Sequence, residues 1–292
     1  MFTKKKCNPA NKTKYSCLDI ILLNKIAKIL NINQKVKPNI LYKLINNKIK
    51  KISNCNSEEC WLTIDKIINN LNQKEINKFK NSFRPQKPLS WYKNKNEWLS
   101  STDIDKVLKQ YEKKYKGFKY FKSTPIDFHL RNKKTKECEV SDLCDFNLKK
   151  LINNNKYKIG MVFNTDYHDE PGSHWVSLYI DIKGINVGHP AIFFFDSTGD
   201  DAQDEVYDFI DKVKTQGKGI GIKIKPYINK KPHQLKNTEC GIYCLHFITS
   251  MLLKKNFNKY INNINNDNYM ENFRNFYYID NINSNKLKKK YN

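Results

Sequence analysis

The sequence contains no apolar run that approaches the roughly 18 residues needed to cross a bilayer as a helix, which predicts that no segment spans a membrane. Its N-terminus is charged, and no apolar segment with a small-residue cleavage site follows, so we expect no secretory signal peptide. Internal repeats are also absent. Together these absences exclude the membrane-spanning and repeat classes of protein.

Acidic residues are scarce, with 29 Asp and Glu against 53 Lys and Arg, and the formal net charge is +24 over 292 residues. The positive charge is densest in residues 1–90, and lysine runs lie near both ends, at Lys4–Lys6 and Lys288–Lys290. Such a balance favours acidic partners, nucleic acid first, so non-specific association with DNA is expected. A lysine-rich composition that merely keeps the chain soluble is the alternative explanation.

Cysteine is present eight times, but the pattern lacks the features of a metal site. Without a secretory signal, these residues are expected to be free thiols in a reducing compartment and not a disulfide framework. Cys55 and Cys60 resemble half of a zinc site, but no matching Cys or His pair lies near them. We therefore expect neither a metal nor another cofactor.

The first third of the chain has helical character. Apolar residues recur at helical spacing over residues 18–30 and, more weakly, over 60–80, as in helical hairpins. Two prolines in "SFRPQKPLSWY" indicate a linker near 82–92. The sequence therefore predicts a basic helical N-terminal arm over 1–88 and a second domain over 89–292.

A change of pattern follows an amphipathic helix that begins near Ser101, with Ser101 or Thr102 as its N-cap. Strands are predicted at 156–164, 174–182, 191–196 and 219–228, and the sequence "DEVYDFIDKVK" between the last two is predicted to be a helix. A further apolar helix begins at Cys240. Strands bracketed by helices indicate an α+β fold.

Three reactive side chains stand at the ends of these predicted elements. His174 opens one strand, Asp196 closes the next, and Cys240 opens a helix. A helix N-terminus and a nearby imidazolium both favour a thiolate. His174 would then act as the base for Cys240 and later as the acid for a leaving amine, while Asp196 would hold the His174 tautomer.

Oxyanion donors are predicted from the same stretch of sequence. Gln234, six residues before Cys240, would offer an amide N–H to a developing oxyanion, and the backbone N–H of Cys240 would offer a second. Cys244, one turn deeper in the helix, is predicted to be a packing residue. The remaining histidines, at positions 129, 168, 189, 233 and 246, are interpreted as structural.

The ordered set His174-Trp175, Asp196, Gln234 and Cys240-Gly241 resembles the cysteine protease superfamily that includes the SUMO-specific proteases and the adenovirus protease. Papain-like enzymes are disfavoured, because in them the cysteine comes first. The resemblance implies a central mixed sheet flanked by helices, with an N-terminal helical arm.

The segments "VFNTDYHDEPGSHWVSLYIDIKG", "FFFDSTGDD" and "HQLKNTECGIY" are most similar to the polyprotein-processing cysteine proteases of large DNA viruses, the African swine fever virus protease-like family. That family has Asn as the third catalytic residue, whereas this chain has Asp196, as the SUMO proteases do. Both branches cut at Gly-Gly sites through a narrow slot, because only glycine passes without a Cβ. The resemblance implies that Trp98 and Trp175 roof such a slot, with Asn164 approaching it from a strand end.

The resemblance implies a viral cysteine endopeptidase that cleaves structural polyprotein precursors at Gly-Gly-x sites during virion maturation. Its partners would be those polyproteins, and its location would be the host cytoplasm, at viral assembly sites, and the virion. Two alternatives remain. One is a deconjugating protease for SUMO- or ubiquitin-like modifiers. The other is a basic nucleic-acid-binding or structural virion protein on an inactive protease scaffold, which the complete catalytic set argues against.

Overall fold

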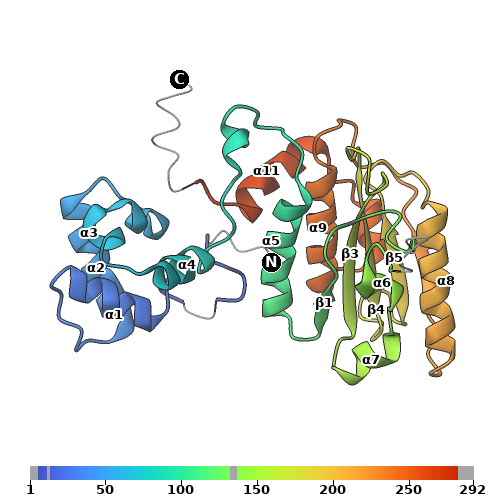
Figure 1. Cartoon of the computed structure of the whole chain (residues 1–292), viewed down its shortest axis with the longest axis horizontal. Helices are drawn as coiled ribbons and strands as arrows, with labels where there is room; N and C mark the ends of the chain where they lie inside the picture. The colour runs from blue at the N-terminus through green and yellow to red at the C-terminus, as the bar shows by residue number, and fades with distance from the viewer. Residues whose placement is uncertain (1–5, 12–13, 132–136, 282–292) are drawn as a thin grey trace. The chain divides into compact units, whose positions relative to one another are not determined.

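A computed structural model describes residues 6–11, 14–131 and 137–281 of the chain (Figure 1). Lys4, Lys5 and Lys288–Lys290, which the sequence analysis singled out, lie outside the described residues. The chain divides into two compact units: a core unit of residues 96–274, and an arm unit of residues 2–95 with 275–292.

A mixed sheet organises the core unit. Its strands run in the order β1 (Phe118–Tyr120), β3 (Lys158–Asn164), β4 (Trp175–Asp181), β5 (Ala191–Phe195) and β6 (Lys225–Ile228), with the short β2 (Thr124–Pro125) beside β3. β4 pairs antiparallel with both of its neighbours, β3 and β5. β1 and β2 pair in parallel with β3, and β6 pairs in parallel with β5. The prediction of an α+β fold around a mixed sheet is confirmed.

Helices cover both faces of this sheet. In Figure 1, α5 (Ser101–Lys114) and α9 (Cys240–Leu252) lie on one side, and α8 (Asp204–Lys218) lies on the other. Short helices complete the unit: α6 (Ser141–Cys144), α7 (Leu148–Asn153), α10 (Phe257–Asn262) and α11 (Asp267–Tyr277). One face of β4 packs with the α8 side chains in a single core, through Val176, Leu178 and Ile180 and through Ile182 just after the strand. The opposite set is also buried, so β4 is a central strand.

Two element boundaries differ from the predictions. The α5 cap is Ser100, one residue earlier than expected, because its hydroxyl accepts from Asp103 N–H while the Asp103 carboxylate accepts from Ser100 N–H. The strand expected over 219–228 forms only at Lys225–Ile228. α8 instead continues to Lys218, and the glycine-rich residues that follow turn the chain, with Gly221 at φ +76°.

Helices dominate the arm unit, as the apolar spacing predicts. They are α1 (Ile20–Ile29), α2 (Pro38–Ile52), α3 (Asp65–Ile68) and α4 (Gln73–Asn81), with 3-10 turns at Glu58–Thr63 and Leu89–Tyr92. Leucines and isoleucines of α1 and α2 form the core together with the buried rings of Trp61, Phe79 and Phe83. Hydrophobic burial in a unit of this kind needs no sheet.

The last described residues return to the arm unit. Ile279 pairs in parallel with Gln86, and the ring of Tyr278 packs edge-on against Trp91 with centroids 5.0 Å apart. The segment expected to be a linker near 82–92 is therefore a packed part of this unit, because Trp91 is buried and Ile279 N–H donates to Pro85 O at 2.9 Å. The predicted boundary between residues 88 and 89 stays a prediction.

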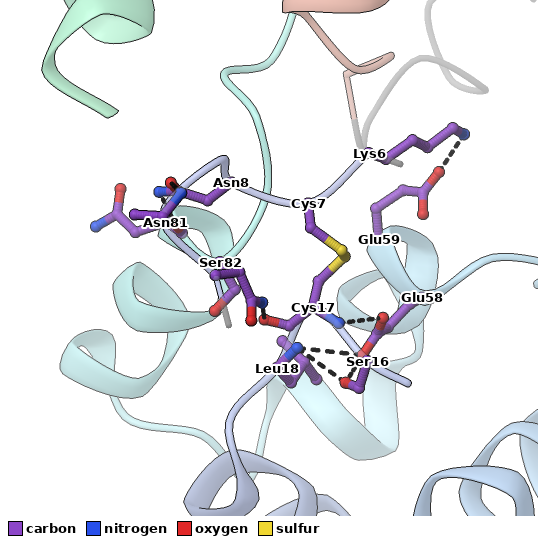
Figure 2. Close-up of a disulfide and its surroundings, with 12 residues drawn as sticks. Lys6, Cys7, Asn8, Ser16, Cys17, Leu18, Glu58, Glu59, Asn81 and Ser82 are labelled. Carbon is purple, nitrogen blue, oxygen red and sulfur yellow. Dashed lines mark hydrogen bonds and ion pairs between the residues drawn. A yellow bond between two sulfur atoms is a disulfide. The ribbon is translucent and has the colours of Figure 1, made fainter. Parts of the chain in front are cut away.

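Six of the eight cysteines form disulfides, so the expectation of free thiols is wrong for them. The pairs are Cys7–Cys17 (Figure 2), Cys55–Cys60 and Cys138–Cys144. Loops of 5–10 residues bring their Cα atoms to 5.0–6.4 Å, within the range that a disulfide spans. The inference of a reducing compartment thereby loses its basis.

The Cys7–Cys17 disulfide fixes a buried carboxylate beneath it (Figure 2). Glu58 accepts from the backbone N–H groups of Cys17 at 2.8 Å and Leu18 at 3.3 Å, and from the Ser16 hydroxyl. These donors satisfy a charge that burial would otherwise disfavour.

Within the part of the chain that the structure describes, no helix is long and apolar enough to cross a membrane.

Candidate active site

Three sheet and helix ends bring the predicted catalytic residues together. His174 directly precedes β4, Asp196 directly follows β5, and Cys240 is the first residue of α9. β4 and β5 are antiparallel neighbours, with Ser177 opposite Phe195, so the start of one strand lies beside the end of the other. α9 packs on the same sheet, since the Cys244 thiol donates to Trp175 O at 3.3 Å.

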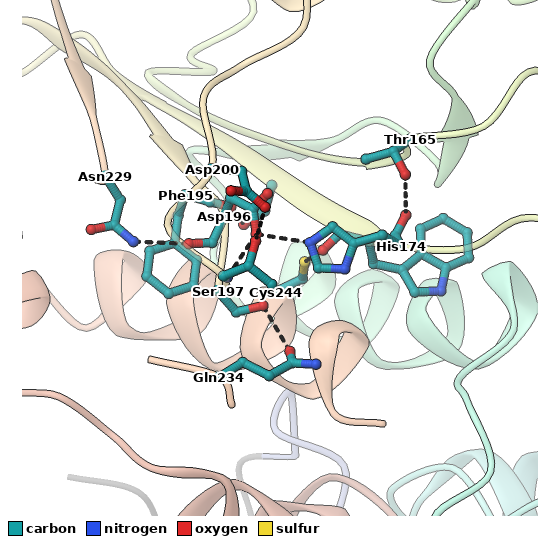
Figure 3. A network of polar contacts seen from close by, with 12 residues as sticks. Thr165, His174, Phe195, Asp196, Ser197, Asp200, Asn229, Gln234 and Cys244 are labelled. Carbon is teal, nitrogen blue, oxygen red and sulfur yellow. Dashed lines mark hydrogen bonds and ion pairs between the residues drawn. The ribbon is translucent and has the colours of Figure 1, made fainter. Parts of the chain in front are cut away.

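His174 and Asp196 form the central contact of this site (Figure 3). Nε2 of His174 lies 2.8 Å from Oδ1 of Asp196. Hydrogen bonding to the Cys240 side chain also helps to raise the pKa of the same ring. With Nε2 engaged by the carboxylate, Nδ1 is the ring atom left for the thiol. The backbone holds the histidine as well, because Thr165 N–H donates to His174 O at 2.9 Å.

The electrostatic balance at His174 favours the imidazolium. Burial lowers the pKa of the ring, but the hydrogen bonds to Asp196 and Cys240 and the negative charge of both outweigh it, so the pKa rises from 6.5 to about 10. A charged ring beside a cysteine stabilises a thiolate. The pair is therefore arranged as an imidazolium facing a nucleophilic sulfur.

Asp196 is itself held by the turn that follows it. Its Oδ1 accepts from the backbone N–H and from the hydroxyl of Thr198, both at 2.8 Å. The carbonyl oxygen of Asp196 accepts from the side-chain amide of Asn229 at 2.8 Å, as Figure 3 also shows. These bonds fix the carboxylate on the His174 side and leave it little freedom to turn away.

Cys240 is 2% exposed and begins a helix, where unpaired backbone N–H groups favour negative charge. The preceding residue, Glu239, forms a buried ion pair with Arg274 at 2.8 Å, and Arg274 also donates to Thr238 O at 3.1 Å. This ion pair anchors the loop that leads into the helix. Gly241 allows close packing, because a Cβ there would lie 3.0 Å from Cβ of Leu99.

Gln234 is buried and is oriented by Ser197, the residue after Asp196. The Ser197 hydroxyl donates to Oε1 of Gln234 at 2.8 Å, and Ser197 O accepts from the Gln234 backbone N–H at 2.8 Å (Figure 3). With its oxygen fixed, the amide nitrogen donates one hydrogen to Lys236 O at 2.5 Å. Its second hydrogen remains for an oxyanion.

Cys244 is 1% exposed, and burial first, then the charge of Cys240, raises the pKa of its thiol well above the usual value. These facts fit the predicted packing role. His233 and His246 are buried and His189 is hydrogen-bonded to Tyr227. His168 is hydrogen-bonded to the buried Asp127 and also lines a cleft together with His174.

A cleft of about 670 Å³ opens beside His174. Its walls include His174 and all three predicted substrate-binding residues, Trp98, Asn164 and Trp175. Trp98 is 42% exposed, and Trp175 is anchored by its indole N–H, which donates to Leu99 O at 2.9 Å. The Asn164 side chain also forms a turn contact, accepting from Asp166 N–H at 3.0 Å.

Positioning residues were harder to find than reactive ones. Ser197 and Thr198 follow Asp196 in "FDSTGD", where Ser and Thr after an acidic turn offered a weak signal. Arg274 offered none, because it lies on α11 and reaches Glu239 only through the fold. Among the described residues, no group of three His, Cys, Asp or Glu side chains is arranged to hold a metal ion.

A protein-family model described as YopJ serine/threonine acetyltransferase matches residues 64–290, more than three quarters of the chain. The chain belongs to this family. Proteins with a similar sequence are named as proteases. A thiol protease of Acanthamoeba polyphaga mimivirus is 30% identical over 168 residues, which cover 57% of this chain and 52% of that protein. The chain thus spans about half the length of this relative.

A cysteine protease of African swine fever virus is 26% identical over 188 residues, covering 62% of this chain and 68% of that protein; in another isolate it is named a SUMO-1 cysteine protease. The crystal structure of the African swine fever virus protease superposes with a TM-score of 0.74 at 21% identity, over 96% of this chain and 98% of that one. The chain therefore has the fold of a viral cysteine protease, and its relatives are named thiol protease, cysteine protease and SUMO-1 cysteine protease.

Proposed function

We propose that this chain is a viral cysteine endopeptidase that cleaves structural polyprotein precursors at Gly-Gly-x sites during virion maturation. The observation that carries the proposal is the 2.8 Å contact between His174 and Asp196, with Cys240 on the same imidazole at a helix start. Relatives named cysteine and thiol proteases support the reaction type.

In the proposed mechanism, the Cys240 thiolate attacks the carbonyl carbon of the cleaved peptide bond. The carbonyl electron pair moves to oxygen, and the Gln234 amide and the Cys240 backbone N–H donate to that oxyanion. The intermediate collapses, the C–N bond breaks, and the leaving amine takes a proton from His174, which leaves a thioester. Water then gives a proton to His174, attacks the thioester, and releases the carboxylic acid and the thiolate.

Glycine specificity follows from the aromatic walls of the cleft. Trp175 is held against the Leu99 carbonyl, and Trp98 lines the same space. A slot between two indole rings admits a backbone without Cβ atoms and excludes larger side chains. The polyprotein substrate is thus proposed to place two consecutive glycines beside these rings.

The deciding experiment compares wild type with Cys240→Ala on two substrates: a Gly-Gly-x peptide with residues on both sides of the bond, and a SUMO-type fusion. Cleavage of the peptide by wild type alone supports the proposal. Cleavage of the fusion alone supports the deconjugating protease instead. The name of one African swine fever virus relative, SUMO-1 cysteine protease, favours that function.

A second candidate function, transfer of an acetyl group to Ser or Thr hydroxyls, is favoured by the description of the matching family model. An acetyl thioester on Cys240 would form from a thioester donor, whose thiol would leave with a proton from His174. A Ser or Thr hydroxyl in place of water would then give its proton to His174 and receive the acetyl group, which releases the Cys240 thiolate. Incubation with a labelled acetyl thioester and a Ser/Thr-rich protein separates the two reactions. Label on the acceptor that depends on Cys240 would support acetyl transfer.

Partners and location form the remaining part of the proposal. The enzyme would act on viral polyproteins at assembly sites in the host cytoplasm and in the virion. Its net charge of +24 supports non-specific association with DNA, although an inactive nucleic-acid-binding scaffold has the same charge. No retardation of duplex DNA at low salt would remove the DNA association. Loss of biological activity in Cys240→Ala would exclude the inactive scaffold.

A further inference from the structure

The cleft beside His174 differs in charge from the rest of the molecule. The chain has 53 Lys and Arg residues, yet none of those that the structure describes lines this cleft, whereas Glu97, Glu139 and Glu170 do. None of these three carboxylates forms an ion pair with another described residue. In a strongly cationic chain, three carboxylates without a cation at one site are unusual.

The two histidines of the cleft do not offset this charge. Nδ1 of His168 lies 2.5 Å from Oδ2 of Asp127, a buried carboxylate, and the hydrogen bond to Asp127 raises the pKa of His168. His174 is paired with Asp196 in the same way. Each ring therefore has its own carboxylate. The charge of Glu139 also helps to raise the pKa of His168, but none of the three glutamates forms an ion pair with either ring.

Two further features of the same walls suit a ligand. Trp98 and Tyr167 are 42% and 45% exposed, so both rings present open aromatic surface. Thr124, only 5% exposed, also lines the cleft, and its hydroxyl has no hydrogen-bond partner in the described part of the chain. A buried hydroxyl without a partner is disfavoured unless a bound group completes it.

We propose that this cleft selects a Lys or Arg side chain in the peptide segment that flanks the cleaved bond. A cationic side chain would be attracted by the three carboxylates and would stack on the exposed rings of Trp98 or Tyr167, as cations do on aromatic faces. The Thr124 hydroxyl would complete a hydrogen bond to the substrate. This inference rests on the proposed peptidase function and adds the charge of its substrate.

The test uses matched Gly-Gly-x peptides that differ at one flanking position at a time, with Lys, norleucine or Glu. Norleucine keeps the aliphatic stem of Lys without its charge. We expect kcat/KM for the best Lys peptide to exceed that of its norleucine partner about tenfold, mainly through KM, and the ratio to fall as salt rises. Equal rates for Lys, norleucine and Glu at every position would overturn the inference.

Variants assign the effect to the cleft. The triple substitution Glu97→Gln, Glu139→Gln and Glu170→Gln removes the charge but keeps an acceptor oxygen, such as the one that Glu170 offers to Tyr167 N–H at 2.8 Å. We expect it to reduce the Lys preference to less than threefold. Asp208→Asn, an exposed carboxylate on α8 outside the cleft, is the matched control and should keep the preference. A preference that survives the triple substitution would refute the role of the glutamates.

A binding assay separates this inference from the proposed function. Fluorescence anisotropy of labelled peptides with the full-length Cys240→Ala chain needs no cleavage. Tighter binding of the Lys peptide that depends on the three glutamates would support the cleft specificity even if wild type cuts none of the peptides, an outcome that would refute only the peptidase. Cleavage without any charge preference would support the peptidase and refute the inference.

Discussion

One oxygen of Asp196 accepts hydrogen bonds from the His174 ring and from the backbone N–H and hydroxyl of Thr198, each at 2.8 Å. Such a convergence gives the carboxylate a single orientation, and through it the imidazole. At this scale the candidate reactive residues could be predicted from the sequence, because Cys, His and Asp at the ends of strands and helices suit thiol chemistry. Ser197 and Thr198, which only orient them, were not recognised.

The charge of Asp196 should be visible in the titration of His174. The folded-state pKa is raised from 6.5 to about 10, so the protonated ring stabilises the fold fully below pH 6.5, and this contribution is lost as the pH rises through about 10. Asp196→Asn keeps an oxygen for Thr198 but removes the charge. We expect the NMR titration midpoint of His174 to fall by about one unit or more.

His168 serves as the internal control in that titration, because its partner is Asp127 and not Asp196. Its midpoint should not move in Asp196→Asn. An unchanged midpoint of His174 in the variant would contradict the electrostatic coupling inferred from the 2.8 Å contact.

Ser197 permits a test of the proposed oxyanion donor through its neighbour. Ser197→Ala removes the hydroxyl that holds Oε1 of Gln234 but leaves the Ser197 carbonyl and its backbone hydrogen bonds in place. We expect kcat for a cleaved peptide to fall about tenfold with little change in KM. Gln234→Ala, which removes the donor itself, should lower kcat by about 100-fold or more.

The two substitutions should not be additive, since both act on one amide. A double variant that loses the product of the two single effects would show that Ser197 acts independently of Gln234.

At the scale of elements, glycines mark where the turn after β5 meets the loop that carries Gln234. Gly199 has φ +82°, and a Cβ there would lie 2.7 Å from Pro232 N, a backbone atom that cannot yield easily. Gly221, at φ +76° after α8, faces open space within 4 Å. The two residues share a left-handed backbone and differ only in surroundings.

This difference predicts unequal effects of the same substitution. Gly221→Ala should lower the free energy of unfolding by about 1 kcal/mol, the cost of a left-handed Ala. Gly199→Ala should lower it by about 1–3 kcal/mol more, because packed backbone must also move. Urea unfolding of both variants measures this, and equal losses would contradict the close approach of the two loops.

The order of strands and helices in the core unit was predictable because continuous apolar runs such as "AIFFF" must be buried. The burial of Ser177 and Asp181 could not be predicted in this way, because both are polar. Both are fully buried polar residues on β4, because α9 covers their face of the sheet. Which helix covers which face depends on contacts distant in sequence, and periodicity along one strand does not contain that information.

At the scale of the whole molecule, neither the disulfides nor the pairing of the C-terminal segment with the arm unit was predicted from the sequence, and the reason is the same for both. Cysteine spacing does not determine which Cα atoms approach, and no local pattern connects Gln86 with Ile279. The relationship to viral cysteine proteases, by contrast, was predictable, because the ordered motif around His174, Asp196 and Cys240 resembles theirs. The roles assigned to those residues stay predictions.

The packing of Tyr278 gives a prediction about the arm unit. Its side chain is 1% exposed and meets the Trp91 ring, so Tyr278→Ala should destabilise this unit by about 3 kcal/mol. Limited proteolysis should then cut within residues 14–95 faster than in wild type. Tyr269→Ala, which removes a ring that is 45% exposed in the core unit, should leave that rate unchanged.

The pairing of Ile279 with Gln86 also sets an order of events during synthesis. Residues 96–274 separate these two partners in the sequence, so the whole core unit is synthesised before Ile279 can reach Gln86. The arm unit can therefore complete its fold only after the core unit has been made.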